Sequence, residues 1–469
     1  MESPSQNTRL STIDASGNRL WVYPSDVSGR YRNRRTWVSG LLLLVFLLLP
    51  WLRMGGHQAV LFDIWNGRFS VFGLRFWSHD APILLFLIAG AAVSLALVTS
   101  IWGRLWCGWA CPQTVFVDLV FRRIERWIEG DAVRRRQLDQ GPWNEDKVSK
   151  KIFKWVAYFF VALIISHSFV AYFIGTEKLA IMISRSPGEN LGTFTAMSIM
   201  TAAVLFDFGW FREQFCTLLC PYGRFQSVLM DQRSLAIVYD SKRGEPRRGA
   251  AAAQKQNQGD CIDCEKCVHV CPTGIDIRNG LQMECIACTA CADACDGVME
   301  KIGKPVGLVR YSSVQEKGLK RFARPGAYFL VLCVLISGLY FVLAKREPVE
   351  LTLIRKVGAP YEEVLRPGQE KEIVNSFKLD LLNQTFETIE VEFAQPGPGV
   401  PIGLQWVSSG LPAKLAAGES RRIDLFVRFP VSQVKMGSGK AVLETVTNSP
   451  ALPVASVQKQ EVPLVGPLR

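Results

Sequence analysis

The chain has 469 residues, enough for several domains, with a formal net charge of +12 and 49% hydrophobic residues. A basic excess of this size can indicate nucleic-acid binding. Here long apolar stretches indicate a membrane protein whose basic residues set its orientation, so we expect no nucleic-acid partner.

Five stretches are apolar and long enough to cross a lipid bilayer, which takes about 17 to 25 residues. They are Thr36–Leu52, Ala81–Trp102, Ile152–Gly175, Leu191–Phe211 and Gly326–Ala344. The first four belong to a predicted transmembrane core, residues 36–230, and the fifth is a single helix, residues 326–344. A signal peptide is not expected, because the polar tail 1–35 precedes the first span and no small-residue cleavage site follows it.

Basic residues set the predicted orientation. They gather in the tail, between spans two and three, and between spans four and five, whereas loops 54–80 and 176–190 carry few. The tail and the segment after span four should therefore be cytoplasmic and residues 345–469 periplasmic, in a bacterial inner membrane. The cysteines agree with this orientation, since reduced thiols belong on the cytoplasmic side and all except Cys333, which lies within span five, fall there.

Two short segments between the larger parts have recognisable patterns. Val60–Trp65 and Arg68–Trp77 flank Asn66-Gly67, which predicts a β-hairpin. Residues 241–258, rich in Lys, Arg, Gly, Ala and Gln, predict a flexible linker.

A C-x3-C-P motif occurs twice, at the ends of spans two and four. The cysteines are Cys107 and Cys111 before Pro112, and Cys216 and Cys220 before Pro221. If the helix continues, this spacing places both thiols of a pair on one face, and each proline marks a break or a new helix. Amphipathic stretches follow at Val115–Ile128 and Tyr222–Met230, which predict interfacial helices. The core thus looks like two parallel copies of one hairpin.

We hypothesise that the two cysteine pairs meet and bind one metal centre. Four thiolates could hold a third iron–sulfur cluster or zinc, and two or three could hold Cu(I). The alternative is four packed, inert cysteines. His167 in span three and Asp207 in span four are weaker candidates, because intramembrane ionisable groups are often functional but also hydrogen-bond neighbouring helices. Cys333 is expected to be a packing residue.

Residues 259–300 carry the strongest motif, C-x2-C-x2-C-x3-C-P followed by C-x2-C-x2-C-x3-C. This spacing is typical of a bacterial ferredoxin with two 4Fe-4S clusters, in which the fourth cysteine of each run ligates the other run's cluster. Disulfides would not require this spacing, and structural zinc usually takes two separated C-x2-C pairs. The expected ligands are Cys261, Cys264, Cys267 and Cys295 for one cluster, and Cys285, Cys288, Cys291 and Cys271 for the other.

Residues 345–469 change to a period-two pattern. The candidate strands are Glu350–Arg355, Glu370–Phe377, Phe386–Phe393, Arg421–Phe429 and Ala441–Val446. Short, regularly spaced strands predict an immunoglobulin-like sandwich. This segment contains no cysteine and no catalytic pattern, so we expect a docking role. The predicted fold is thus a multidomain membrane protein with about five transmembrane helices, an α+β ferredoxin and an all-β domain.

The whole arrangement resembles the FixG/CcoG family of cytochrome oxidase accessory proteins. The resemblance rests on Ala59-Val-Leu-Phe-Asp-Ile, Trp106-Cys-Gly-Trp-Ala-Cys-Pro-Gln-Thr-Val-Phe, Gly209-Trp-Phe-Arg-Glu-Gln-Phe-Cys, Cys220-Pro-Tyr-Gly-Arg-Phe-Gln-Ser, Asp260-Cys-Ile-Asp-Cys and Cys271-Pro-Thr-Gly-Ile-Asp-Ile-Arg. Related membrane proteins of nitrate and nitrous oxide respiration generally lack the external β domain. At Cys295-Asp296 the chain departs from the Cys-Pro of many ferredoxins, which bears on the loop and not on ligation.

The resemblance implies a role in assembling cbb(3)-type oxidase, with reduction of Cu(II) to Cu(I). A cytosolic donor would supply electrons through the clusters to the four C-x3-C-P cysteines. The implied partners are a copper exporter or chaperone and oxidase subunits, and a homodimer stays open. The rival hypotheses are a quinone-linked electron carrier without copper chemistry and a non-enzymatic assembly scaffold.

Overall fold

The computed structural model describes residues 12–13, 16, 18–78, 80–230, 234–247, 259–313, 322–364, 371–393, 403–448 and 456–468. The chain forms two compact units. The first contains Met1–Asp63 and Leu85–Gly338, and the second contains Ile64–Leu84 and Leu339–Arg469.

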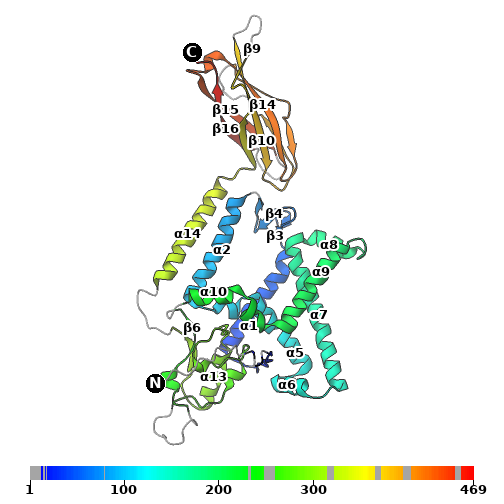
Figure 1. The fold of residues 1–469 in the computed structure, drawn as a ribbon, viewed down its shortest axis with the longest axis vertical. Helices are drawn as coiled ribbons and strands as arrows, with labels where there is room; N and C mark the ends of the chain where they lie inside the picture. The colour runs from blue at the N-terminus through cyan, green and yellow to red at the C-terminus, as the bar shows by residue number, and fades with distance from the viewer. Residues whose placement is uncertain are drawn as a thin grey trace. The chain divides into compact units, whose positions relative to one another are not determined.

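Within these described ranges, five helices are long and apolar enough to cross a membrane, as the sequence predicts. They are α1 (Arg30–Leu48, extended by η1, Leu49–Trp51), α2 (Ala81–Trp102), α7 (Glu145–Ile174), α9 (Leu191–Val204, continued by the π-helix η3, Leu205–Phe211) and α14 (Ala323–Ala344) (Figure 1). Helices α1 and α7 begin well before their predicted apolar stretches. At α7 the added turns start at a cap, where the Asn144 side chain accepts a hydrogen bond from the Lys147 N–H at 2.8 Å.

Helix α1 begins early because an acidic residue far along the chain caps it. The N-cap residue, Gly29, has no side chain to satisfy the first N–H groups. The carboxylate of Asp293, in α13 (Ala290–Lys301), accepts hydrogen bonds from the N–H groups of Tyr31 at 3.1 Å and Arg32 at 2.6 Å. A Cβ atom added to Gly29 would lie 2.3 Å from Cγ of Asp293, so only glycine allows this approach.

Short helices contain the first cysteine of each pair and follow the second. They are α3 (Leu105–Trp109), α4 (Pro112–Val115), the π-helix η2 (Phe116–Phe121), α5 (Arg122–Glu129) and α6 (Ala132–Gln140) after α2, and the π-helix η4 (Phe215–Leu219) and α10 (Pro221–Leu229) after α9. A further helix, α8 (Thr176–Ser184), follows α7.

The helix does not continue through either cysteine pair, and the break or new helix predicted at each proline is found. Cys111, with φ −62° and ψ 127°, and Cys220, with φ −68° and ψ 110°, are extended and precede the first residue of a new helix. The following prolines disfavour the helical conformation at these two positions. The stretch after Pro112 also differs from a surface helix, because Phe116 and Phe121 are buried in a core with Tyr158 of α7.

The ferredoxin segment contains α12 (Lys266–His269), η5 (Ile277–Asn279) and α13. Strands β6 (Ala236–Tyr239) and β7 (Val309–Ser312) pair antiparallel on either side of it in sequence, so the module extends past residues 259–300. The predicted linker does not begin as flexible chain. Residues Ser241–Gly244 form helix α11, and Arg243 Nε donates to Asp260 at 2.6 Å. The rest of the predicted linker, from 248 to 258, lies outside the described residues.

The predicted hairpin is found, but its second strand is divided in two. Strand β3 (Val60–Asp63) is followed by a turn containing Gly67, and the segment predicted as one strand divides into β4 (Arg68–Val71) and β5 (Leu74–Trp77), which pair with each other. The division occurs at Phe72 and Gly73, both with positive φ. Strands β1 (Arg53–Met54) and β2 (His57–Gln58) form a separate short pair.

The C-terminal strands form two packed sheets, which confirms the immunoglobulin-like prediction (Figure 1). One sheet has the order β12-β14-β10-β8 with β9 beside β10, and the other has the order β13-β11-β15-β16. The strands are β8 (Val349–Arg355), β9 (Glu362–Val364), β10 (Glu372–Asn383), β11 (Ile389–Phe393), β12 (Gln405–Ser408), β13 (Ala413–Leu415), β14 (Ser420–Pro430), β15 (Ser438–Asn448) and β16 (Ser456–Val465). Alternate residues such as Leu379, Val391 and Leu443 are fully buried between the sheets.

Candidate functional site

The eight ferredoxin cysteines interact with one another across the two runs. The thiol of Cys295 interacts electrostatically with Cys267, Cys261 and Cys264 of the first run. In the same way, Cys291 interacts with Cys288 and Cys285 of its own run and with Cys271 and Cys267 of the first. These interactions across the runs support the crossed ligand sets that the spacing predicts, and the assignment of each cysteine to one cluster stays a prediction.

The two cysteine runs share one loop geometry. Asp263 and Glu265 have φ of 53° and 55°, and the corresponding residues of the second run, Ala287 and Thr289, have φ of 54° and 65°. Residues other than glycine rarely adopt this left-handed conformation, and it persists only where the surroundings enforce it. Each run therefore turns sharply between its ligands, as wrapping a cluster requires.

The donor sets fit 4Fe-4S clusters. Each offers four soft thiolates, and backbone N–H groups of Ala287 and Ala290 point at the sulfur atoms of Cys285 and Cys288. Among the described residues, no three His, Cys, Asp or Glu side chains converge closely enough to hold a single metal ion. That finding includes the ferredoxin cysteines, whose clusters spread four thiolates over several iron atoms.

Paired substitutions test the crossed ligand sets. In Cys261→Ser/Cys295→Ser both changes affect one cluster, so we expect about half of the ferredoxin iron to remain. In Cys261→Ser/Cys271→Ser both clusters lose a ligand, and we expect nearly all of this iron to be lost. Iron and sulfide counts on anaerobically purified protein measure the difference. The opposite ranking of the two double variants would show that each run holds its own cluster.

The four C-x3-C-P thiols lie within electrostatic reach of one another. Cys216 interacts with Cys111, Cys107 and Cys220, although it is more than one hundred residues away from the first pair in sequence. The Cys107 thiol donates a hydrogen bond to Gln226 Oε1 at 3.3 Å, which joins the first pair to the helix after the second. The structure thus brings the two pairs near one another, but no three of these described thiols converge closely enough to hold a single metal ion, and a metal bound there stays a prediction.

Burial raises the pKa of the Cys107 and Cys216 thiols and so keeps them protonated when no metal is bound. Burial, followed by the neighbouring Cys111, raises the pKa of Cys107 to about 12. Burial likewise raises the pKa of Cys216 well above its ordinary value. Metal binding requires thiolates, so loading this site would release protons and weaken as the pH falls.

Gly108, between the two cysteines of the first pair, lies against the second ferredoxin run. A Cβ atom added there would lie 2.5 Å from the carbonyl oxygen of Ile286 and 2.8 Å from the backbone nitrogen of Cys288. No other residue type permits this contact without displacing backbone. The loop that carries Cys285 and Cys288 therefore touches the chain between Cys107 and Cys111.

Arg104 also links the first cysteine pair to the second ferredoxin run. Its buried guanidinium donates to the backbone oxygen atoms of Met283, Cys285 and Gly223, with 3.2 Å to Cys285 and 3.3 Å to Gly223. One side chain thus connects the first cysteine pair, the helix after the second pair and a cluster-binding loop. Its counterpart in the repeat, Arg212, has a different role, because it forms an ion pair with Glu125 at 2.7 Å.

Sequence reasoning missed several residues of this region. Gly108, Gln113 and Gln226 were not singled out, although a glycine inside a cysteine pair can signal a close backbone approach. The basic residues between spans two and three were assigned to topology alone. In the structure many of them pair with buried acids, as Arg135 does with Glu125 at 3.0 Å and Lys151 with Glu129 at 2.8 Å.

The three weaker candidates, His167, Asp207 and Cys333, lie in different surroundings. His167 lines a cavity of about 540 Å³ between α7, α8 and α9, and its Nδ1 pairs with the carbonyl of Leu163 in its own helix at 2.8 Å. Asp207 accepts a hydrogen bond from Gln113 Nε2 at 3.0 Å, close to the cysteine pairs. Cys333 is exposed on α14, which has no buried residue among those described, so the expected packing role is not found there.

Comparison with known proteins identifies the parts. Residues 211–314 match a family described as a 4Fe-4S dicluster domain, and residues 82–131 match a 4Fe-4S binding domain. Residues 339–466 match the IG-like fold at the C-terminal of FixG. The chain is 35% identical to protein RdxA of Cereibacter sphaeroides over 431 residues, which cover 88% of this chain and 90% of RdxA. The chain belongs to the FixG/RdxA family.

Two further relatives support this assignment. Nitrogen fixation protein FixG of Rhizobium meliloti is 41% identical over 64% of this chain and 58% of its own length. Protein RdxB of Cereibacter sphaeroides is 38% identical over 69% of this chain and 68% of its own length. As a FixG/RdxA protein, the chain is a membrane iron–sulfur electron-transport protein with 4Fe-4S clusters in its ferredoxin domain.

Proposed function

We propose that this protein reduces Cu(II) to Cu(I) at the four C-x3-C-P cysteines during assembly of a cbb(3)-type oxidase. The ferredoxin would face the cytoplasm, where a soluble donor reduces it, and the immunoglobulin-like domain would face the periplasm. Copper is here the substrate. A copper exporter or chaperone and oxidase subunits would be the partners.

One observation carries this proposal. Gly108 lies against the backbone of Ile286 to Cys288, so the acceptor thiols of the first pair and a cluster-binding loop share a contact. Arg104 ties the loop to both cysteine pairs through three backbone carbonyls. Electron transfer between two centres requires such proximity, which an inert set of packed cysteines would not need.

The four thiolates would bind the product, Cu(I), more tightly than the substrate, Cu(II). The 4Fe-4S clusters supply single electrons, and each Cu(II) ion gains one electron that the reduced ferredoxin loses. Thiolates favour Cu(I), so binding at these cysteines would pull the reduction forward. The match of residues 82–131, which contain Cys107 and Cys111, to a 4Fe-4S binding domain favours the alternative that these thiols hold a third iron–sulfur centre, in which case copper would be reduced beside that centre and not bound by the thiols.

A stoichiometric assay tests the proposed reaction. Protein purified anaerobically, reduced and freed of excess reductant should convert added Cu(II) to Cu(I), with one Cu(I) formed for each electron that the clusters lose. A Cu(I)-specific chelator measures the Cu(I) formed, and the visible absorption of the clusters measures the electrons that they lose. Clusters that stay reduced in the presence of Cu(II) would exclude the reaction. Clusters oxidised only by an added quinone would favour the quinone-linked alternative, for which the cavity at His167 is the supporting observation.

A further inference from the structure

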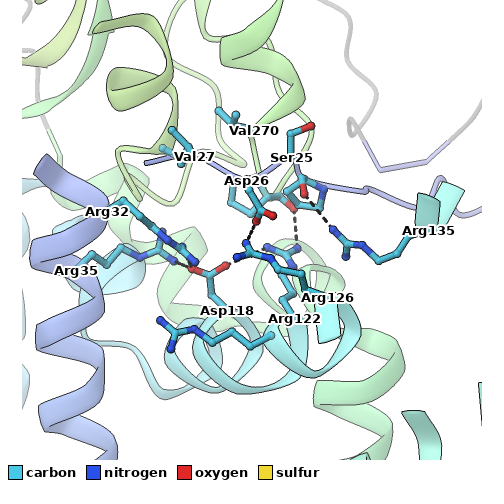
Figure 2. A pocket seen from close by; sticks show the side chains of 14 residues that line it. Ser25, Asp26, Val27, Arg32, Arg35, Asp118, Arg122, Arg126, Arg135 and Val270 are labelled. Atoms are coloured by element: carbon cyan, nitrogen blue, oxygen red, sulfur yellow. Dashed lines mark hydrogen bonds and ion pairs between the residues drawn. The ribbon is translucent and has the colours of Figure 1, made fainter. Parts of the chain in front are cut away.

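An arginine-rich pocket lies beside the ferredoxin runs and does not take part in the proposed copper reduction. Figure 2 shows arginines from α1, from the helices after Pro112 and from α6 turned toward Asp118 and the segment that contains Asp26. Six arginines line it, namely Arg32, Arg35, Arg122, Arg123, Arg126 and Arg135.

The pocket carries more positive charge than its own acids balance. Against six arginines, the lining contains two carboxylates, Asp26 and Asp118, which leaves a net charge of +6 − 2 = +4. Glu125 and Glu213 reach Arg135 at 3.0 Å and Arg122 at 3.4 Å from outside the pocket. Both of these acids are shared with a further arginine, Arg212 or Arg19, so they do not remove the excess.

Two guanidinium groups also keep N–H donors without an acceptor. Arg135 is only 6% exposed, and its Nε has no hydrogen-bond partner among the described residues. Nε of Arg122 is likewise buried without a partner within the described ranges. A buried donor without an acceptor costs free energy, and here two of them line one positively charged pocket.

We propose that this pocket binds a phosphate group. Guanidinium groups pair with phosphate through planar, paired hydrogen bonds, and a divalent oxyanion would offset more of the excess charge than another carboxylate could. The group could belong to an anionic lipid or to a soluble phosphate compound, since basic pockets beside membrane helices can bind lipid headgroups.

The bound phosphate would lie next to a cluster-binding residue. Arg122 donates to the carbonyl of Pro272 at 3.3 Å, directly after Cys271, and the pocket lining includes Ala290, directly before Cys291. Both cysteines belong to the same predicted cluster. Occupancy would add negative charge near that cluster and so lower its reduction potential.

The test uses the full chain in phosphatidylcholine nanodiscs with and without phosphatidylglycerol. Inorganic phosphate is titrated by calorimetry, and retained lipid is identified by native mass spectrometry. Saturable phosphate binding that is unaffected by phosphatidylglycerol would indicate a soluble source. Binding that phosphatidylglycerol abolishes, with retained phosphatidylglycerol, would indicate a lipid. If neither phosphate nor phosphatidylglycerol binds the native chain, the proposal is wrong.

Matched charge variants locate the site. Arg123 is exposed and lines the pocket, so Arg123→Gln should fold normally, keep its iron and weaken phosphate or lipid binding about tenfold. Arg134→Gln removes the same charge from an exposed residue of α6 that does not line the pocket, and should change the affinity less than about twofold. Equal weakening by both variants would show attraction to net charge and overturn the proposed site.

Discussion

Replacing Cys216 with serine should abolish Cu(II) reduction while leaving the ferredoxin clusters reducible. The serine hydroxyl keeps the size of the side chain but removes a soft ligand from the four interacting thiols. Changes in the outer shell of a metal site typically cost roughly 10 to 100-fold in affinity or activity, so loss of a ligand should lower the rate by at least about a hundredfold. Stopped-flow measurement of Cu(I) formation after chemical reduction gives the rate.

Cys333→Ser is the matched control, because this thiol is exposed on α14 and belongs to neither cysteine set. It should reduce copper at the native rate. The informative comparison is between Cys216→Ser and Cys107→Ser, which should be equally impaired if both pairs serve one centre. Native rates in both variants, with normal iron in the ferredoxin, would assign the reduction to another site.

Glu125→Ala should be the most destabilising single substitution outside the ferredoxin. Glu125 is 6% exposed and accepts hydrogen bonds from Arg212 at 2.7 Å and from Arg135 at 3.0 Å. Its removal leaves two buried guanidinium groups without their shared acid, which typically costs about 3 to 5 kcal/mol. Thermal unfolding in detergent should show the loss as a lower midpoint.

The exposed residue Glu300 provides the control, and Glu300→Ala should stay within about 0.5 kcal/mol of the native chain. Arg212→Ala added to Glu125→Ala should cost less than the sum of the two single changes, because the two side chains share one interaction. Additive losses would show that the ion pair does not carry the effect.

The carboxylate of Glu125 also makes the stability of the fold depend on pH in the acidic range. Burial alone would raise the pKa of Glu125, but Arg212, Lys154 and Arg135 lower it well below its usual range. A carboxylate with a lowered folded-state pKa stabilises the fold above its unfolded pKa, about 4.3, and this contribution is lost as the pH falls toward the folded value. Glu125→Gln should therefore lose less stability than the native chain below about pH 4.

The motifs that predicted the fold are those in which local sequence determines the structure. The apolar length of α2 and the period-two pattern of β14 depend on neighbouring residues, and both elements lie close to the predicted ranges. The cysteine spacing likewise led to ligand sets that agree with the neighbours of Cys295 and Cys291.

The parts that sequence did not predict depend on contacts between distant segments. The contact of Gly108 with Cys288 joins residues far apart in the chain, and the glycine inside the cysteine pair does not indicate which segment approaches it. The basic residues are a second example. From sequence alone, Arg135 could either mark the cytoplasmic side of the membrane or form a buried ion pair, and only its contact with Glu125 in the structure distinguishes the two. Strand β16 was missed because two of its inward positions, Gln458 and Gln460, are polar, so the apolar alternation does not extend over the strand.

The cap on α1 has a consequence for how this protein matures. The start of α1 leaves the ribosome long before Asp293, so the helix enters the membrane with its first N–H groups bonded only to water. Asp293 lies between Cys291 and Cys295, one ligand of each predicted cluster, so the two clusters, once bound, would position it. With those ligand sets, we expect insertion of iron and completion of the first membrane helix to be one late event in biosynthesis. A chain starved of iron would keep an unfinished helix end, which quality-control proteases could recognise.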